Sequence, residues 1–192
     1  MAVKKTKPGN TLRIIGGQFR GRKLSFADLP GLRPTGDRLR ETLFNWLSPH
    51  LYGSRCLDLY AGSGALALEC LSREAGHVTA LDQAPLVINT LRSHAETLNT
   101  NDLSLHNGDA ISWLSGPKGE PFDLVFIDPP FDQNLWQPTI DSLVKHGHLN
   151  PNAAVYIESG RDCPYIAPTQ WRLHREKTAG QVTARLYFNE AD

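Results

Sequence analysis

The segment FDLVFIDPPFD, residues 122–132, combines an apolar run with side chains that can do chemistry. The apolar run predicts a strand covered on both faces of a sheet, with Asp128 at its carboxyl end. Pro129 and Pro130 restrict the backbone, so the chain leaves the strand stiffly. Asp128 and the carbonyl group of Pro129 can then accept hydrogen bonds from one exocyclic amino group, while Phe131 stacks on the base that carries it. The alternative is an ordinary strand end followed by a core phenylalanine.

A glycine-rich turn lies about 70 residues before Asp128, in the segment CLDLYAGSGALALE. Gly62 and Gly64 allow a ligand to approach the backbone where the turn meets a helix N-terminus. With Ala67 they also match the G-x-G-x-x-A pattern of dinucleotide sites, so a nicotinamide dinucleotide is a competing ligand. Asp58 precedes the turn, where a carboxylate disfavours a pyrophosphate and favours an ammonium group.

Two further aspartates follow the next two predicted strands. Asp82 ends the second strand and can accept hydrogen bonds from ribose hydroxyl groups, and Asp109 follows the third strand in the sequence NGDA. Each could equally be a loop carboxylate that caps a helix. Because ligands gather at the carboxyl ends of parallel strands, their recurrence there favours a ligand site.

The charges are unevenly distributed along the 192 residues. The chain holds 20 basic and 20 acidic residues, but positions 1–40 carry ten lysines and arginines against two aspartates, a balance of 10 − 2 = +8. A basic end favours a partner rich in phosphate, and the glycines among its arginines allow close approach. The alternative is a solubilising tail. The remaining residues therefore carry −8.

The cysteines and the hydropathy limit the class of protein. Cys56, Cys70 and Cys163 are odd in number and widely spaced, which favours a reducing compartment and argues against a disulfide framework or a metal site. No stretch approaches the roughly 18 apolar residues of a membrane span, and the N-terminus lacks an apolar signal core. We therefore expect a cytoplasmic protein with no membrane and no metal.

Alternating strands and helices must position these residues. The expected strands are Cys56 to Tyr60, His77 to Asp82, Leu103 to Asn107, Phe122 to Ile127 and Ala153 to Glu158. The expected helices are Ala65 to Arg73, Pro85 to Leu98, Ala110 to Leu114 and Leu135 to His146. This order predicts a parallel α/β sheet. The end of the chain predicts two antiparallel strands that turn near Gly180 at one edge of that sheet.

The N-terminal part predicts a short extension on one main domain. The segment LRIIGGQFRGRKLSF predicts a β-hairpin that turns near Gly16 and Gly17, and TGDRLRETLFNWL predicts a helix with Thr35 as its N-cap. We therefore divide the chain into a basic extension, 1–34, and a main domain, 35–192. Thr35, Arg38 and Arg40 could contact a carboxylate of the cofactor, bind phosphate, or cap and solubilise this helix.

Several motifs resemble those of known families. DLYAGSG resembles the first motif of class I S-adenosylmethionine methyltransferases, and DPPF resembles the [N/D]-P-P-[F/Y] signature of methyltransferases that act on adenine, guanine or glutamine amide nitrogens. The segments RIIGGQFRGRKL, LRPTGDRLRETLFNWL, LDLYAGSGALALE, FIDPPF and HREKTAGQVTARLY together resemble the bacterial family of 16S ribosomal RNA guanine-N2 methyltransferases of the small subunit. The resemblance extends from about residue 12 to residue 188.

This resemblance implies a Rossmann-like class I methyltransferase fold with a seven-stranded sheet, mostly parallel, that ends in an antiparallel C-terminal hairpin. It implies S-adenosylmethionine as cofactor and, as partner, 16S ribosomal RNA in an assembling or assembled small subunit; we expect a monomer. The implied catalytic residues are Asp128, Pro129, Pro130 and Phe131. The implied cofactor residues are Asp58, Tyr60, Ala61, Gly62, Ser63, Gly64, Asp82, Asp109 and Ala110, with Asp58 at the amino group and Asp109 at the adenine. The implied RNA contacts are Arg13, Arg20, Arg22, Lys23, Arg33 and Arg38.

One position departs from the family pattern. Members commonly carry an acid two residues before the position of Asp82, where this chain has Ala80. Asp82 then either takes over the ribose contact, or the cofactor binds less tightly. The rival functions are an N6-adenine methyltransferase acting on DNA or RNA, a glutamine methyltransferase, a noncatalytic RNA-binding assembly factor and a dinucleotide dehydrogenase.

Overall fold

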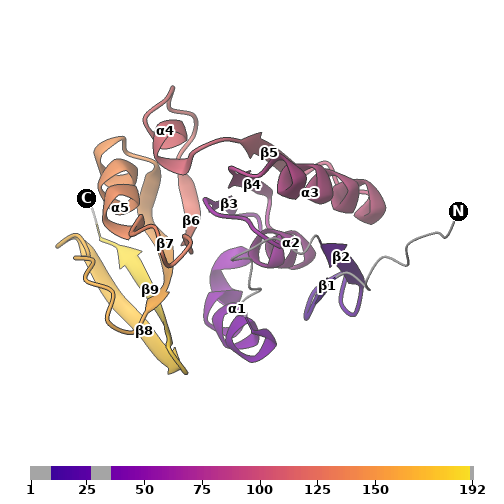
Figure 1. Cartoon of the computed structure of the whole chain (residues 1–192), viewed down its shortest axis with the longest axis horizontal. Coiled ribbons are helices and arrows are strands. Elements are labelled where there is room, and N and C mark those ends of the chain that lie inside the picture. Colours follow the sequence, from indigo (N-terminus) through magenta and orange to yellow (C-terminus); the bar gives the residue numbers. More distant parts are fainter. Residues whose placement is uncertain (1–9, 27–35, 191–192) are drawn as a thin grey trace, which may run out of the picture.

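A seven-stranded sheet forms the middle layer of the protein (Figure 1). The computed structural model describes residues 10–26 and 36–190. The strands of this sheet are β3 (Arg55–Asp58), β4 (His77–Asp82), β5 (Leu103–Asn107), β6 (Phe122–Ile127), β7 (Leu149–Gly160), β8 (Trp171–Ala179) and β9 (Val182–Asn189). They lie in the order β5-β4-β3-β6-β7-β9-β8, and only the β7–β9 and β9–β8 pairs are antiparallel. The predicted parallel sheet with an antiparallel C-terminal pair is confirmed.

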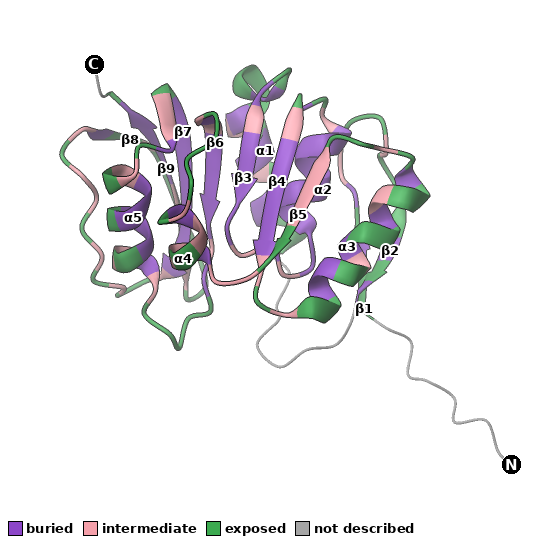
Figure 2. Cartoon of the chain, turned by 90° about the horizontal axis from the view of Figure 1, so that it is seen from above, coloured by how far each residue is buried: buried purple, intermediate pink, exposed green. Residues whose placement is uncertain are grey.

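Helices cover both faces of this sheet. The first face packs against α1 (Asp37–Leu51), α2 (Ala65–Ser72) and α3 (Pro85–Leu98), and the second against α4 (Ala110–Leu114) and α5 (Trp136–Lys145). Successive side chains alternate between the faces, so Phe126 packs on the α1 side while Val125 and Ile127 pack on the α5 side. Figure 2 shows the buried central strands between the two helical layers.

The chain changes direction across the sheet between β3 and β6. The strands β3, β4 and β5 follow one another outward on one side of this point, and β6 and β7 lie on the other side. Open α/β sheets bind ligands at such a switch point, outside the carboxyl ends of the strands. We call the carboxyl ends of β3, β4, β6 and β7 the carboxyl edge.

The hairpin of the basic extension, residues 10–26, is part of the folded core. Its strands β1 (Asn10–Arg13) and β2 (Lys23–Phe26) form the predicted antiparallel hairpin, with Leu12 opposite Leu24. Both leucines are buried in the same cluster as the apolar faces of α1, α2 and α3. The division into a separate extension and a main domain stays a prediction, but the hairpin packs on that domain directly.

Some predicted boundaries move. β3 ends at Asp58 instead of Tyr60, because the chain turns there into the glycine loop. β7 begins at Leu149 instead of Ala153: Leu149 pairs with Phe122 across a register shift, and Asn152 adopts a positive φ of 61°. The asparagines and the proline in this stretch favour a loop, so the sequence predicted a later start for β7.

The start of α1 also differs from the prediction. Thr35, the predicted N-cap, lies outside the described residues, and Gly36 is the N-cap, without a side-chain hydrogen bond. Arg40, which was expected on the polar face of the helix, is fully buried. It lies one helical turn before Leu43 and Phe44 on the apolar face, so packing decides its position.

Candidate active site

Three carboxylates meet at the carboxyl edge. Asp58 pairs with Phe126 on β6, two residues before Asp128, and Ile127 pairs with Ile157 on β7, so Glu158 lies beside Asp128. Strand alternation directs all three side chains to the α1 side of the sheet. The sequence predicted Asp58 and Asp128 but missed Glu158, although Glu158 is the last residue of the strand expected from Ala153 to Glu158.

Asp58 is buried without a full set of partners. It is 1% exposed, and no described group hydrogen-bonds its Oδ2 atom. Burial is the main reason why the pKa of Asp58 rises to about 7; the nearby charge of Asp82 adds to this, while the backbone N–H groups of Tyr60 and Ala67 oppose it. A buried acceptor of this kind fits a cationic donor from a ligand, such as an ammonium group.

Asp128 lies in a similar environment. Burial raises its pKa well above the ordinary value, and the charges of Glu158 and Asp58 raise it further. Within the described residues, no lysine or arginine forms an ion pair with Asp128 or Asp58. A bound cation would therefore favour the ionised forms of both carboxylates.

The residues after Asp128 present an aromatic ring to solvent. Pro129 is buried, whereas Pro130 is exposed and Phe131 is 46% exposed. The centroid of the Phe131 ring lies 5.6 Å from that of Trp136, with the planes tilted by 52°. Trp136, which the sequence analysis missed, donates from Nε1 to the carbonyl oxygen of Glu158 at 2.8 Å. One face of Phe131 is thus supported while part of the ring stays available for stacking.

The glycine loop has the close packing expected for a ligand turn. Gly62 and Gly64 have φ values of 52° and 78°, which favour glycine. The N–H of Gly64 donates to the carbonyl of Ala61 at 2.7 Å, and a Cβ atom at Gly64 would lie 2.2 Å from Cδ2 of Leu91. Ala61 and the predicted cofactor residue Ser63 are both buried.

Asp82 holds the glycine loop in place. Its Oδ2 accepts from the N–H of Gly62 at 2.9 Å, and its Oδ1 accepts from the N–H of Ala84 at 2.8 Å. The carboxylate therefore connects the end of β4 to the loop that follows β3. Its contact with a ribose stays a prediction, and Ala80, at the position of the missing acid, is buried in β4.

Asp109 caps α4, which is the alternative that the sequence left open. Its Oδ1 accepts from the N–H of Ser112 at 2.7 Å, and its Oδ2 accepts from Nε2 of Gln83 at 3.0 Å. The Ser112 N–H is the main cause that lowers the pKa of Asp109. The adenine contact of Asp109 stays a prediction, as does a cofactor role for the buried Ala110 that follows.

Tyr60 links the glycine loop to α5. Its hydroxyl group shares a hydrogen bond with Oγ1 of Thr139 at 2.5 Å, and burial raises its pKa to about 12. The phenol therefore stays neutral and fixes one side of the carboxyl edge. The sequence identified Tyr60 only through the family motif and gave no signal for its partner.

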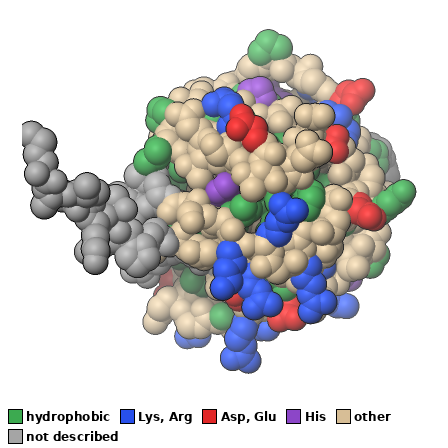
Figure 3. Space-filling model, turned by 90° about the vertical axis from the view of Figure 1, so that its right-hand side faces the viewer, with side chains coloured by type: hydrophobic (Ala, Val, Ile, Leu, Met, Phe, Trp, Pro, Cys, Tyr) green, Lys and Arg blue, Asp and Glu red, His purple; other side chains and the backbone are tan. Residues whose placement is uncertain are grey.

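Three of the predicted RNA contacts lie on the loop of the hairpin or next to it. Arg20, Arg22 and Lys23 are exposed around the hairpin loop, and Nη1 of Arg22 donates to the carbonyl of Thr97 near the end of α3 at 3.2 Å. Helix α3 begins at the carboxyl edge and runs away from it, so this loop lies toward the opposite edge. Figure 3 shows lysine and arginine side chains gathered on the hairpin side of the molecule.

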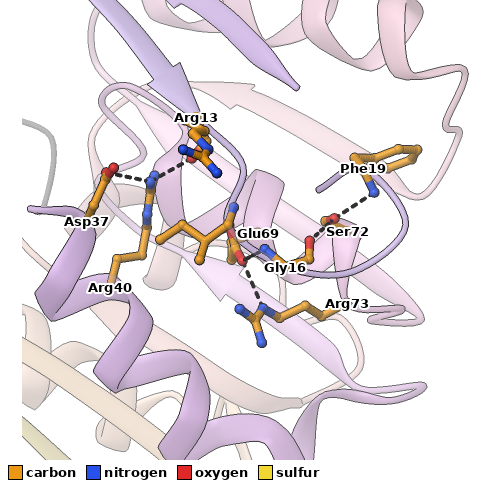
Figure 4. A network of polar contacts seen from close by, with 9 residues as sticks. Arg13, Gly16, Phe19, Asp37, Arg40, Glu69, Ser72 and Arg73 are labelled. Carbon is orange, nitrogen blue, oxygen red and sulfur yellow. Dashed lines mark hydrogen bonds and ion pairs between the residues drawn. The ribbon is translucent and has the colours of Figure 1, made fainter. Parts of the chain in front are cut away.

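Of the other predicted contacts, Arg13 lies opposite Lys23 in the hairpin, Arg38 lies in α1, and Arg33 is outside the described residues. Arg13 is exposed at the end of β1, and Arg38 is exposed in the first turn of α1. Arg40 is structural: its Nη2 donates to the carbonyl of Arg13 at 2.7 Å and to Oδ1 of Asp37 at 2.9 Å (Figure 4). Burial lowers the pKa of Arg40.

Residues 10–26 and 36–190 contain neither a candidate metal site nor a candidate membrane helix. No group of three or more histidine, cysteine, aspartate or glutamate side chains there is placed to hold a metal ion. None of the helices in these ranges combines the length and apolar character that a membrane crossing needs.

Comparisons with known proteins agree on one family. The family described as "Conserved hypothetical protein 95" matches residues 12–188. The "Ribosomal RNA small subunit methyltransferase D" of Escherichia coli strain K12 is 49% identical over 182 residues, which cover 94% of this chain and 91% of the relative. The solved structure of yhhF from Escherichia coli has a TM-score of 0.87 and 48% identity, covering 95% of this chain and 100% of that chain.

A distant solved structure has the same fold. SMU.776, in a structure complexed with SAH, has a TM-score of 0.71 over 98% of this chain and 58% of its own. At 13% identity the likeness supports the fold alone. The expected class I methyltransferase fold is confirmed by the sheet order together with these comparisons.

Proposed function

The chain belongs to the family described as "Conserved hypothetical protein 95", and on this basis we propose that it methylates ribosomal RNA of the small subunit. The methyl donor is S-adenosylmethionine. The acceptor is the exocyclic N2 amine of one guanine in 16S ribosomal RNA. The enzyme acts in the cytoplasm as a monomer, on RNA in an assembling or assembled subunit.

The observation that carries this proposal is the pair of carboxylates across the switch point, of which Asp58 is buried and Asp128 is partly exposed. Asp58 has an oxygen atom without a described partner beside the glycine loop, and Asp128 lies on the next strand with Phe131 after it. The first carboxylate fits an ammonium group of the cofactor, and the second fits an amino group of the substrate. The neighbouring positions of β3 and β6 support a transfer between these two ligands.

When bound, the cofactor supplies an electrophilic methyl group on a sulfonium. The residues of this chain then position the amine. The N2 lone pair of guanine delocalises into the ring, so the site must favour a pyramidal nitrogen whose positive charge grows during transfer. Asp128 and the Pro129 carbonyl accept hydrogen bonds from the N–H groups of the amine and stabilise that charge. Asp128 does not need to remove a proton before the methyl group moves.

The target base must leave its helical stack to reach Asp128, as enzymes that act on bases require. Phe131 then stacks on it. Arg13, Arg20, Arg22 and Lys23 of the hairpin contact the RNA backbone, because lysine and arginine release counterions from phosphates. Arg33 and Arg38 are further candidates for such contacts.

The choice of guanine N2 rests on the resemblance of the segments along residues 12–188. An N6-adenine methyltransferase shares the DPPF motif and is the main alternative. A noncatalytic assembly factor has no need for the carboxylate pair, and a dinucleotide dehydrogenase needs neither Asp128 nor the basic hairpin.

The test is methyl transfer from labelled S-adenosylmethionine onto 16S ribosomal RNA, free and in small subunits, with mass mapping of the modified nucleotide. We expect one guanine that carries a methyl group on N2. A methylated adenine would replace the proposed base, and the absence of any labelled product on either substrate would contradict the proposal.

A further inference from the structure

The hairpin loop between β1 and β2 is bound to α2 by a buried carboxylate. Glu69 is 1% exposed in the middle of α2. Its Oε2 accepts from the N–H of Ile15 at 2.9 Å, and its Oε1 accepts from the N–H of Gly16 at 2.8 Å and from Nε of Arg73 at 2.9 Å. Figure 4 shows this group of contacts, which we call the Glu69 network.

Ser72 extends the network by one helical turn. Its hydroxyl group accepts from the N–H of Phe19 at 2.9 Å and donates to the carbonyl of Gly16 at 2.5 Å, while its own carbonyl accepts from the N–H of Gln18 at 2.7 Å. Gly17 has a φ of 73°, and a Cβ atom there would lie 1.7 Å from the Ser72 carbonyl oxygen. The loop can therefore reach this position only with glycine at residue 17.

The residues that follow this fixed stretch carry positive charge. Arg20 and Arg22 are exposed, and the guanidinium of Arg22 lies 5.9 Å from the centroid of the Phe19 ring, whose backbone is part of the network. The backbone on one side of these arginines is thus held by several hydrogen bonds. A loop held in one conformation loses less entropy on binding than a loop that must be ordered by its partner.

We propose that Glu69 is a positioning residue for RNA binding: it holds the loop from Ile14 to Arg22 so that Arg20 and Arg22 face the RNA in one fixed arrangement. This inference rests on the proposed function, because it assigns the hairpin to RNA. The proposed RNA contact of the hairpin loop lies away from the carboxyl edge. Helix α2 begins at the glycine loop, and Glu69 and Ser72 lie toward the other end of this helix.

The first test is Glu69→Gln. Glutamine keeps the size but replaces one acceptor oxygen with a donor, so at least one loop N–H group loses its partner. We expect the dissociation constant for 16S ribosomal RNA to rise about tenfold, because only a fraction of the loop conformations remain competent. The turnover number at saturating RNA and the cofactor affinity should stay within twofold of the wild type.

The direction of the change in RNA affinity distinguishes the loss of loop positioning from the loss of a negative charge. Removing a negative charge by itself strengthens binding to RNA, so a weaker complex must come from the loop. Glu120→Gln is the matched control: Glu120 is 77% exposed in its ion pair with Arg55, and its variant should bind RNA as well as the wild type or slightly better. Gly17→Ala should weaken RNA binding like Glu69→Gln without any change of charge.

A double-mutant cycle separates positioning from a general loss of structure. In a protein that already carries Arg20→Ala and Arg22→Ala, adding Glu69→Gln should change RNA affinity by less than twofold, because the arginines that it positions are gone. An equal loss in both backgrounds would overturn the proposal, and so would a folded Glu69→Gln protein with wild-type RNA affinity.

Folding and the proposed function can be judged separately. If Glu69→Gln does not fold, Ser72→Ala takes its place in the double-mutant cycle. This variant removes two contacts and keeps the carboxylate, and it must weaken RNA binding only when Arg20 and Arg22 are present. If the wild type itself neither binds nor methylates 16S RNA, the proposed function fails. If the wild type does both and the cycle is additive, only the role of Glu69 fails.

Discussion

Glu69 and Asp58 are both buried carboxylates at 1% exposure, but the chain surrounds them differently. Glu69 receives two backbone N–H groups and the Arg73 guanidinium from its own chain. Asp58 keeps an oxygen atom that no described group contacts, and its pKa rises to about 7. Since buried polar groups are nearly always paired in folded proteins, the unpaired oxygen indicates where a ligand supplies the donor.

The same difference extends to the neighbours of each carboxylate. The Glu69 network joins residues of the hairpin to α2 and leaves the loop fixed before any ligand binds. The carboxyl edge instead brings Asp128 and Glu158 close to Asp58, so that the charges raise the pKa of Asp128. The hydrogen bonds of Glu69 are supplied within the chain, whereas we propose that a bound ligand supplies a partner for Asp58.

The largest effect should follow from changing the carboxylate nearest the substrate. Asp128→Asn should lower single-turnover methylation by roughly 100- to 1,000-fold, because it removes an acceptor for the charge that grows on the amine. Cofactor affinity should stay near the wild-type value. Asp132→Asn, four residues on and exposed, is the matched control. Wild-type rates in a folded Asp128→Asn protein would mean that the DPPF motif is only a stiff strand end.

A smaller effect is expected for the aromatic ring after the motif. Phe131→Ala should weaken productive binding of RNA by about 1 to 3 kcal/mol, the usual contribution of one stacked base. Phe131→Tyr should restore it, since the stacking face is kept. Both variants should fold, because Phe131 is 46% exposed and adds little to the core. Equal activity of the alanine and tyrosine variants would exclude stacking.

The pKa of Asp58 predicts a pH dependence of cofactor binding. With a pKa of about 7, the carboxylate is protonated in most molecules below neutrality, and only the ionised form pairs with an ammonium group. Affinity for S-adenosylmethionine should therefore fall about tenfold from pH 8 to pH 6. Calorimetry at each pH checks this. The profile of Asp58→Asn should be flat over the same range, and a flat wild-type profile would contradict the assignment.

The smallest effect concerns charge on the hairpin side. Arg20→Ala together with Arg22→Ala should reduce the slope of log affinity against log salt by about 1.4 to 1.8, that is, by 0.7 to 0.9 for each lost phosphate contact. Cofactor binding should not change. An unchanged slope would show that these arginines do not contact phosphates and would remove the basis for positioning them.

The sequence predicted the elements well where local chemistry decides them. The apolar strands, the glycine turn and the proline exit after Asp128 have local signals, and the structure places them as expected. The C-terminal pair was recognisable from its turn at Gly180, which has a φ of 61°. Asp58 and Asp128 were found because each ends a strand beside glycine or proline.

The contacts that the sequence missed join distant parts of the chain. Glu69 and its loop partners are 53 and 54 residues apart, and the partners are backbone groups without a residue signature. A local signal did exist for Glu69, since it interrupts the apolar helix ALALECLS. Asp82 was expected at a ligand but also holds Gly62, which no sequence pattern shows.

The central claim is that the two buried carboxylates have opposite purposes, and one paired measurement tests it most directly. Cofactor affinity and thermal unfolding at pH 8 are measured for Asp58→Asn and Glu69→Gln.

Asp58→Asn should weaken S-adenosylmethionine binding by about 1.5 to 3 kcal/mol, the strength of a charged hydrogen bond. Its melting temperature should hold or rise, because a folded pKa raised to about 7 means that the ionised carboxylate disfavours folding at this pH. Glu69→Gln should bind the cofactor normally and unfold more easily by about 1 to 3 kcal/mol, since buried N–H groups lose their acceptor. The reverse pattern, with a stability loss at Asp58 and a cofactor loss at Glu69, would contradict the account.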